Sequence, residues 1–438
     1  MLIPGDANPS SVSFIAGRHA NLYVCRNDGV LFYTGFASET LTNNKALVEL
    51  TSGVKEVDGW DHTMIVKQDG SLWGVGTNYR GQLGNGKKDI ENTEATQQQF
   101  AKILDKGVKH VSCGSSHTVI TKQDGSIWGA GANDMGDLGT NDNKAEHLNF
   151  VQILPKGNDV KEVVAGCRGT LLLKEDGSVF GAGAADEGAF GNNIKTDQRT
   201  FVKIMSGDVK AVAKSCHTLL LKIDGSVWGT GLNQNGQVGD GSFTIRFEFF
   251  KVIPSDAQAV AAGYATSMVI KGDGSLWMAG RNNVGQQGDG GKKDNSVFVK
   301  VISSGVKSAA LAYSSSAILK VDGTVWTTGS KWGLGDGSGV DRNKFVKVPV
   351  PCGSGTFRSG DVCTPYKKCG AGEWTEAAGD AKADTKCKAC SAGTFRASGA
   401  KTYAKEKESD VCTPHKKCGV GEWTEAVGDA KADTKCKG

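Results

Sequence analysis

Short apolar runs separated by glycine-rich turns recur along the first 351 residues of the chain. A typical unit contains an apolar run at His62–Lys67, an Asp-Gly step at Asp69, and a run at Leu72–Gly76 in which small and large residues alternate. Asp-Gly between two such runs is a strong hairpin signal, because glycine adopts the positive φ of the turn at little cost. Two more runs, FAKIL at 100–104 and VKHV at 108–111, follow. Each unit is therefore predicted to hold about four strands.

The Asp-Gly step returns seven times, at intervals of 41 to 55 residues: Asp28, Asp69, Asp124, Asp176, Asp224, Asp273 and Asp322. A single four-stranded unit cannot bury its faces, whereas seven units arranged radially can. The fold class that we predict is all-β, with a seven-bladed β-propeller over residues 1–351. The first unit loses the pattern after Gly35, which suits a terminal repeat near ring closure.

One position of the unit holds a large aromatic side chain beside the G-x-G of the third run. The residues are Trp73, Trp128, Phe180, Trp228, Trp277 and Trp326, with Phe32 in the first unit. A surface of tryptophans is also typical of sugar binding. Because the ring recurs once in each unit beside glycines that allow close approach of a neighbouring backbone, we predict that these rings are structural core between the sheets.

Composition and charge narrow the class of protein. Glycine is abundant, at 61 of 438 residues, and proline is scarce, at 8, while 38% of the residues are hydrophobic and 22% are charged. These values fit a folded, β-rich chain rather than a disordered or collagen-like one. The net charge of +4 gives no case for binding nucleic acid or a membrane surface. No run of about 18 apolar residues is present to predict a membrane span.

Cysteine usage marks a second part of the chain. Eight of the 12 cysteines lie in residues 352–438, where CTPYKKCGAGEWTEAAGDAKADTKCK is repeated almost unchanged. We predict two modules, at 352–388 and 389–438. Zinc ligands are usually spaced two to four residues apart, and only Cys387 and Cys390 meet that spacing. The segment has few large apolar residues, so we predict a loop-dominated structure held by disulfides of Cys352, Cys363, Cys369, Cys387, Cys390, Cys412, Cys418 and Cys436. Their pairing is left open by the sequence alone.

The text G-x-N-x-x-G-Q-L-G-x-G at Gly76–Gly86, with the His-Thr run and the Asp-Gly turn before it, resembles the regulator of chromosome condensation repeat. The resemblance covers about residues 10–350 and implies a seven-bladed propeller. Members of that family include a nuclear exchange factor for a small GTPase, parts of ubiquitin ligases, a secreted bacterial β-lactamase inhibitor and plant receptor ectodomains. The fold therefore does not determine the function.

The cysteine-rich modules, with C-x-x-G-T-F at the start and G-x-x-x-x-D-T-x-C at the end, resemble those of tumour-necrosis-factor receptors. That resemblance implies the pairs Cys352–Cys363, Cys369–Cys387, Cys390–Cys412 and Cys418–Cys436. A propeller followed by such modules resembles the ectodomain of the crinkly-type plant receptor kinases. Because disulfide modules need an oxidising compartment, we expect an extracellular protein whose signal peptide is missing or removed.

Sequence motifs of catalysis are absent: we find no G-x-S-x-G, H-E-x-x-H, phosphate loop or calcium loop. We predict no enzyme activity, no cofactor and no metal. His62, His117 and His217 share one position, seven residues before the aspartate of the turn. Other units hold non-ligating residues there, so packing or a strand-end hydrogen bond is favoured over a catalytic role. Cys25, Cys113, Cys167 and Cys216 lie at different positions in their units and are expected to be buried thiols or isolated bridges.

The segment Phe243–Glu248 alternates apolar and polar residues where other units are hydrophilic. We predict an outer strand whose apolar side chains, Phe243, Ile245 and Phe247, form an interface; coverage of its own edge is the other interpretation. The predicted function is a non-enzymatic, extracellular protein–protein interaction or structural protein, such as a filament subunit or a receptor ectodomain. Its partner would be a protein, possibly a copy of itself. The alternative is an exchange factor or regulator for a small GTPase.

Overall fold

The computed structural model describes residues 11–352, apart from 19–20, 36–43 and 90–96, and the backbone of short strands in the C-terminal part. All the regular elements described are β-strands. The chain divides into two compact units, Met1–Val350 and Pro351–Gly438. Unit 1 contains seven four-stranded antiparallel sheets, so the predicted seven-bladed propeller is confirmed.

Each blade is formed by four consecutive strands, paired in chain order. The strands of blades 1 to 4 are β1 (Val12–Arg18), β2 (Asn21–Arg26), β3 (Leu31–Gly35), β4 (Asn44–Thr51); β5 (Val54–Gly59), β6 (His62–Lys67), β7 (Leu72–Gly76), β8 (Gln97–Leu104); β9 (Val108–Cys113), β10 (His117–Lys122), β11 (Ile127–Ala132), β12 (Glu146–Leu154); and β13 (Val160–Gly166), β14 (Gly169–Lys174), β15 (Val179–Gly183), β16 (Gln198–Met205). Those of blades 5 to 7 are β17 (Val209–Lys214), β18 (His217–Lys222), β19 (Val227–Gly231), β20 (Arg246–Ile253); β21 (Ala257–Ala262), β22 (Thr266–Lys271), β23 (Leu276–Gly280), β24 (Asn295–Ile302); and β25 (Val306–Leu311), β26 (Ser315–Lys320), β27 (Val325–Gly329), β28 (Arg342–Val348).

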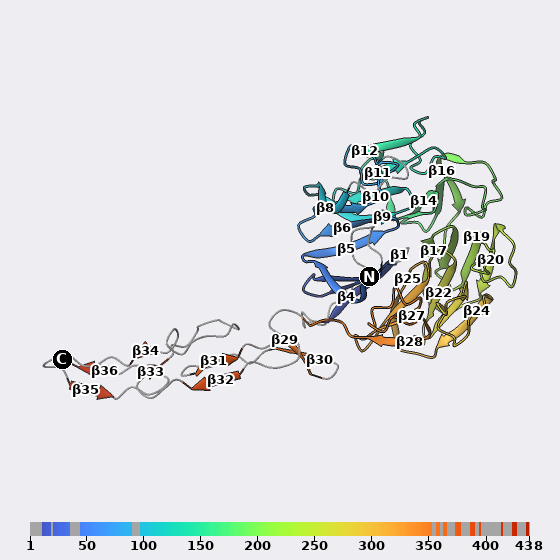
Figure 1. Cartoon of the computed structure of the whole chain (residues 1–438). Helices are drawn as coiled ribbons and strands as arrows, with labels where there is room; N and C mark the ends of the chain where they lie inside the picture. The colour runs from blue at the N-terminus through green and yellow to red at the C-terminus, as the bar shows by residue number, and fades with distance from the viewer. Residues whose placement is uncertain are drawn as a thin grey trace. The chain divides into compact units, whose positions relative to one another are not determined.

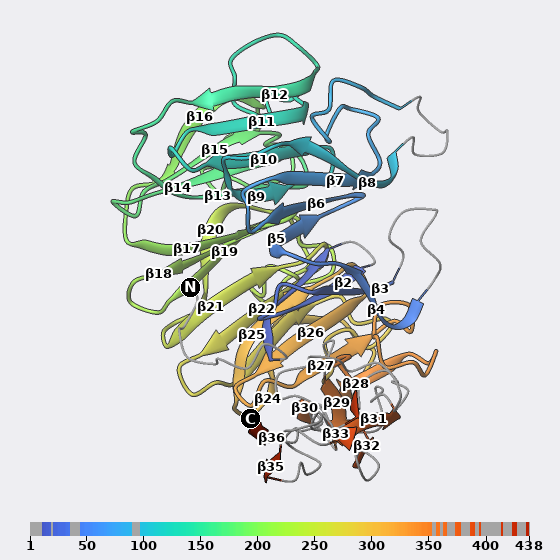
Figure 2. The same cartoon turned by 90° about the vertical axis from the view of Figure 1, so that its left-hand side faces the viewer.

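The first strand of each blade lies nearest the axis of the propeller. Neighbouring first strands, such as β5 and β9 or β17 and β21, contact each other around the ring. Figure 1 shows β9 and β17 towards the middle of the disc and β12 and β20 on its outside. Figure 2 shows the four strands of blade 3 lying side by side, from β9 to β12. The blades therefore radiate from a ring of seven first strands.

Apolar side chains are buried between blades, in seven clusters that each join two neighbours. Leu171, Phe190 and Ile204 of blade 4, for example, pack against Val212 and Leu220 of blade 5. The seventh cluster joins the two ends of the ring, where Leu22 and Phe32 of blade 1 pack against Leu319 and Val348 of blade 7. Blade 1 and blade 7 share no strand among the described residues, so packing closes the ring.

The glycine-rich loop after the third strand locks each blade to the next. Gly288, with φ of +72°, lies so close to the Phe345 ring of blade 7 that a Cβ atom at Gly288 would come within 2.6 Å of it. Four other blades repeat this contact: Gly84–Phe150, Gly139–Phe201, Gly191–Phe249 and Gly239–Phe298. At ring closure, Gly337 N–H donates to the Lys45 carbonyl, and Asp336 forms a β-bridge with Ala46. The motif thus joins blades as well as turning the chain.

The six aromatic rings predicted as structural core are half-buried rather than enclosed. Each packs on the edge of the cluster shared with the preceding blade, as Trp128 does against the residues around Val111. One ring face carries a lysine ammonium, such as Lys122 at 3.7 Å from the Trp128 centroid. The indole N–H donates to Ser126 Oγ at 2.9 Å, and Ser126 Oγ donates to Asp124 at 2.6 Å. The rings therefore seal the outer rim of the blade interfaces.

Unit 2 is described only as paired strands: β29 (Thr356–Ser359) with β30 (Val362–Pro365), β31 (Glu373–Ala377) with β32 (Lys386–Ala389), β33 (Thr394–Phe395) with β34 (Thr413–Pro414), and β35 (Trp423–Ala426) with β36 (Lys435–Lys437). The receptor-like modules, their boundary and the pairing of their cysteine side chains lie outside the described residues. Cys352 is disulfide-bonded, and its partner is likewise outside that part. No helix able to cross a membrane occurs in the residues described.

Candidate protein-binding face

The two ends of the strands define two faces of the propeller. His62 at the start of β6 pairs with Gly76 at the end of β7, so the β5–β6 turn and the β7–β8 loop lie at the same end of blade 2. We call this end, in all blades, the loop face. The Asp-Gly turns, and the connections that lead to the next first strand, lie at the opposite end, which we call the turn face. Because loops on a rigid scaffold often carry recognition, the loop face is the first place to look for a site.

Three histidines join neighbouring blades just below the loop face. The Nε2 atoms of His62, His117 and His217 lie 2.7–3.1 Å from the hydroxyls of Thr118, Thr170 and Ser267 in the following blade. Each of these hydroxyls donates to a loop carbonyl of the preceding blade. It must therefore accept from the imidazole, which places the proton on Nε2. The predicted strand-end hydrogen bond is confirmed.

Burial determines the charge of these imidazoles. All three rings are almost completely enclosed, with 0–1% of their surface exposed. Desolvation lowers the pKa of each of them to about 3. Each ring is therefore neutral at physiological pH and holds its single proton in the bond to the next blade. Such a ring is a structural link and not a poised acid or base.

Aromatic side chains from three blades meet at the axis on the loop face. Trp60 of blade 2 and Tyr264 of blade 6 contact edge to face, with ring centroids 6.4 Å apart. Tyr264 and Tyr313 of blade 7 lie 4.7 Å apart, and Arg281 lies over the Tyr313 ring and donates to its hydroxyl at 3.1 Å. These four residues, the axial aromatic cluster, span non-neighbouring blades. The three aromatic side chains line a small cavity bounded also by Ser215 and Leu311.

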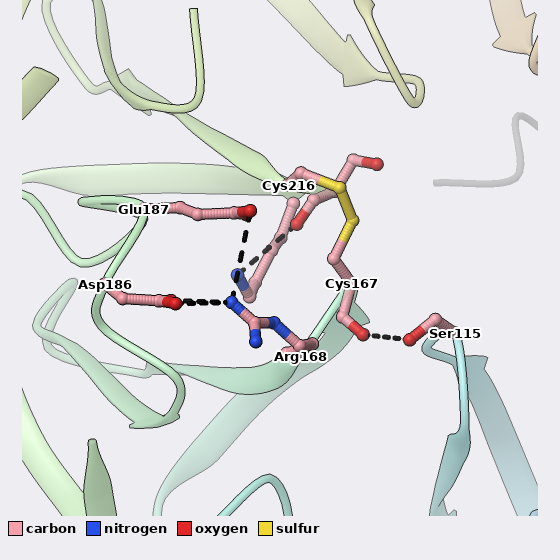
Figure 3. Close-up of a disulfide and its surroundings, with 8 residues drawn as sticks. Ser115, Cys167, Arg168, Asp186, Glu187 and Cys216 are labelled. Carbon is pink, nitrogen blue, oxygen red and sulfur yellow. Dashed lines mark hydrogen bonds and ion pairs between the residues drawn. A yellow bond between two sulfur atoms is a disulfide. The ribbon is translucent and has the colours of Figure 1, made fainter. Parts of the chain in front are cut away.

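A disulfide and a group of charges lie beside this cluster. Cys167 of blade 4 is bonded to Cys216 of blade 5, with Cα atoms 4.9 Å apart. Figure 3 shows Arg168 next to the disulfide and directed towards Asp186 and Glu187. Its guanidinium binds both Asp186 oxygens, at 2.7 and 2.8 Å. The Asp186 side chain is 56% exposed, so this charged pair is accessible from the loop face.

Two buried ionisable groups, Lys214 and Asp137, lie beneath the Arg168–Asp186 pair. Lys214 is 2% exposed and Asp137 is 3% exposed. Burial lowers the pKa of Lys214 to about 8, opposed by the charges of Glu187 and Asp137. Burial also raises the pKa of Asp137 to about 6. Both shifts reflect desolvation, and the two groups lie among the charges that surround the disulfide.

The disulfide occupies one of the four blade interfaces that lack a histidine. Blade 4 has Gly169 at the position that holds His117 in blade 3, so no imidazole can reach blade 5. Cys167 and Cys216 are one position apart in their repeats. They still meet because the turn between the first two strands of blade 4 contacts that of blade 5 with an offset, as the bond from the Cys167 N–H to the Ser215 carbonyl shows. The other two propeller cysteines, Cys25 and Cys113, are buried and form no disulfide. Burial raises the pKa of the Cys25 thiol to about 12.

The interface candidates from the sequence are only partly exposed. Strand β20 begins at Arg246, so Phe243 and Ile245 precede it. Asn193 of blade 4 donates to the Phe247 carbonyl at 2.9 Å, and Lys195 lies over the Phe247 ring. A loop of the neighbouring blade thus pairs with the backbone at Phe247, and the interface formed by these three side chains stays a prediction. Phe243 is 51% exposed and remains an accessible apolar residue of the outer surface.

Residues of the axial aromatic cluster were missed by the sequence analysis. Trp60, Tyr264 and Tyr313 each lie two residues before the histidine position, and Cys167 holds the same place in blade 4. Aligning the seven units at this position would have shown a set of large side chains at one turn. Within the described residues, no group of three or more His, Cys, Asp and Glu side chains is arranged to hold a metal ion.

Comparison with known proteins places these features in a class. The regulator of chromosome condensation (RCC1) repeat matches residues 69–121, and a second form of that repeat matches 108–137, 209–237 and 257–286. The matched residues therefore contain RCC1 repeats, and the structure arranges unit 1 as a seven-bladed β-propeller. The fold is similar to that of yeast RCC1 (Prp20) in its complex with Kap60, with a TM-score of 0.63, 17% identity and coverage of 80% of this chain and 90% of that one.

Curated relatives match only part of the chain. The RCC2 homologue of Xenopus laevis is 28% identical over 132 residues, which are 30% of this chain and 25% of the relative. The X-linked retinitis pigmentosa GTPase regulator of the dog is 30% identical over 134 residues, 30% of this chain and 13% of the relative. The match thus spans a quarter or less of the length of these two proteins.

Proposed function

We propose that the chain is a non-enzymatic, extracellular protein-binding propeller that engages its partner through the loop face. The observation that carries this proposal is the axial aromatic cluster beside the Arg168–Asp186 pair. Trp, Tyr and Arg are the residues that most often dominate protein interfaces. Here they gather on one face of a rigid ring, at turns where other blades carry small residues such as Ser115. Tyr264 is 38% exposed and is accessible to a partner.

The extracellular part of the proposal is supported by cysteine chemistry. The Cys167–Cys216 bridge and the disulfide of Cys352 are of a kind that persists in oxidising compartments and is rare in the cytosol. We expect a tryptic digest of the secreted, unreduced chain to yield the Cys167 and Cys216 peptides as one linked species. Free thiols should appear only at Cys25 and Cys113 within the propeller. Recovery of Cys167 and Cys216 as free thiols from the native source would contradict an oxidising environment.

If the partner binds the loop face, substitutions on that face should lower the affinity for the partner, and substitutions on the turn face should not. The change to test is the double variant Trp60→Ala/Tyr264→Ala, with Ile223→Ser as the control, since Ile223 is 70% exposed on the turn face. An extracellular protein that binds the immobilised wild type is expected to bind the control with the same affinity. Its affinity for the double variant should be lower by about tenfold or more, as for interface hot spots. Equal retention by all three proteins would place the contact elsewhere.

The second candidate is a regulator of a small GTPase. It is favoured by the similarity to a protein named as a GTPase regulator and to yeast RCC1. Purified chain can be mixed with small GTPases loaded with fluorescent GDP, and the rate of GDP release measured. Acceleration that is lost in Trp60→Ala/Tyr264→Ala would support this function over the first. No acceleration, together with retention of an extracellular partner, would favour the first proposal.

A further inference from the structure

The turn face carries a ring of lysines around the axis. In every blade the first strand has a β-bulge directly after its first residue, as between Val54 and Glu56 of β5. The bulged residue is lysine in five blades: Lys55, Lys109, Lys161, Lys210 and Lys307. Blade 6 has Gln258 and blade 1 has Ser13. Because Val54 pairs with Lys67, just before the Asp-Gly turn, the bulges lie at the turn-face end of the innermost strands.

The ring is compact. Lys55 Nζ donates to the Lys109 carbonyl at 2.9 Å, and Lys161 Nζ donates to the Lys210 carbonyl at 3.1 Å. In both cases the lysine at the bulge of one blade reaches the bulge of the following blade. A bulged residue leaves the ladder of strand hydrogen bonds, so these two ammonium groups also satisfy carbonyls that strand pairing leaves unused. All five lysine side chains are exposed.

These lysines differ from the other basic side chains of the propeller. Several arginines on the loop face are paired with carboxylates, for example Arg246 with Asp240 and Arg342 with Asp336. Lysines beside the turns lie over aromatic rings, as Lys222 does on Trp228. None of the five bulge lysines has an ion-pair partner or a ring beneath its ammonium group among the residues described. Their charge is therefore not neutralised by the part of the protein that the structure describes.

Carboxylates near the axis do not balance this ring. Glu56 already accepts from His110 at 3.1 Å and from the Val111 amide. Burial raises the pKa of Glu162, against the opposing charges of Lys161 and His110. Counting both as fully ionised, the five ammonium groups exceed these two carboxylates by three charges; Asp159, Asp208 and Asp256, which precede three of the first strands, are not included in that count. Like charges on one ring of strands repel, and a multivalent anion bound among them would relieve that repulsion.

We propose that the lysine ring binds a compact multivalent anion that carries several phosphate or sulfate groups. Lysine is a compact point charge suited to tetrahedral oxyanions. The size of the ligand follows from the surroundings, because Asp159 and Asp208 lie two residues before Lys161 and Lys210, and Asp256 two before Gln258. A long polyanion lying across the face meets these carboxylates, whereas a small ligand centred on the axis meets the lysines. This site goes beyond the partner-binding role of the loop face.

Calorimetric titration with inositol hexakisphosphate tests the proposal, with a heparin dodecasaccharide as the long sulfated polymer. The variant is Lys55→Gln/Lys109→Gln/Lys161→Gln/Lys210→Gln. Its control, Lys122→Gln/Lys222→Gln/Lys271→Gln/Lys320→Gln, removes the same number of charges from lysines that lie over tryptophan rings. We expect the wild type and the control to bind inositol hexakisphosphate alike, and the ring variant to bind at least about tenfold more weakly, with an affinity that falls as salt rises.

Each other result overturns the proposal. Absence of binding to the wild type would remove the site, and equal weakening in both quadruple variants would reduce it to a net-charge effect. If the wild type bound the heparin dodecasaccharide but not inositol hexakisphosphate, the ligand would be a long polyanion and not a compact one. Replacing the four ring lysines by arginine keeps the charge and should preserve binding, so that a folding defect of the glutamine variant, seen in its thermal unfolding, is separated from loss of the site.

Discussion

Acidification from pH 6.5 to pH 4.5 is expected to destabilise the propeller strongly. His62, His117 and His217 have pKa values lowered to about 3 in the folded chain by burial, against about 6.5 when unfolded. Between these values the unfolded chain binds more protons, so stability falls as the pH falls. Over this interval each imidazole lowers the free energy of unfolding by about 2.3 kcal/mol, and the three together lower it by about 7 kcal/mol.

One buried group opposes this trend. The pKa of Asp137 is raised to about 6 in the folded chain, so the folded state gains its proton first, and acidification stabilises it by about 2 kcal/mol. Lys214 is protonated in both states over this range, because its pKa is about 8. The net loss in the free energy of unfolding is about 5 kcal/mol, a large part of the stability of an ordinary domain.

Urea unfolding at several pH values measures this effect. The matched variant is the triple change His62→Gln/His117→Gln/His217→Gln, because the glutamine amide can donate to the same hydroxyl and does not titrate. We expect it to be less stable than the wild type at pH 7 but to show a much flatter dependence on pH. If the wild type keeps its midpoint of unfolding down to pH 4.5, the imidazoles are not held neutral by the blades.

Gly288→Ala is expected to be the most damaging single methyl addition that we describe. The backbone at Gly288 has φ of +72°, and the new Cβ would lie 2.6 Å from the ring of Phe345, which is itself 9% exposed. The left-handed backbone costs about 1–2 kcal/mol for a residue other than glycine, and forced overpacking adds about 1–3 kcal/mol. We expect a loss of about 3–4 kcal/mol in the free energy of unfolding.

Gly305→Ala separates the two causes. Gly305 has φ of +80°, but no atom lies within 4 Å of its would-be Cβ. It therefore pays the backbone cost of about 1–2 kcal/mol alone. Thermal and urea unfolding of both variants give the difference, and Gly288→Ala/Phe345→Leu should recover part of it. Equal effects of the two alanines would mean that the glycine–phenylalanine contact does not hold blades 6 and 7 together.

The local features of the fold were predictable because each depends on residues close in sequence. The Asp-Gly turn, the alternation at Leu72–Gly76 and the spacing of the units all lie within one repeat. The degree of burial of Trp128 was not predictable, because it depends on how far the neighbouring blade extends over the ring and on Lys122 above it. The half-buried state is a property of the interface between two repeats.

The candidate sites depend on geometry between repeats, which periodicity alone does not give. Trp60 and Tyr264 are about 200 residues apart and meet only because the ring brings blades 2 and 6 to one axis. Cys167 and Cys216 occupy different positions of their units, and this difference concealed a pairing that a diagonal offset between turns allows. The lysines of the bulges were visible in the repeated VK pairs, but the bulges that remove them from the strand ladder were not.

Closure of the ring by packing, with every blade made from one continuous segment, has a topological consequence. The contacts between blades 7 and 1, including Gly337 with Lys45 and the cluster around Phe32, are of the same kind as those elsewhere in the ring. Cutting the chain between two other blades would sever no strand. The chain could therefore be circularly permuted. It would begin at another blade, and every blade would keep the same two neighbours in the ring.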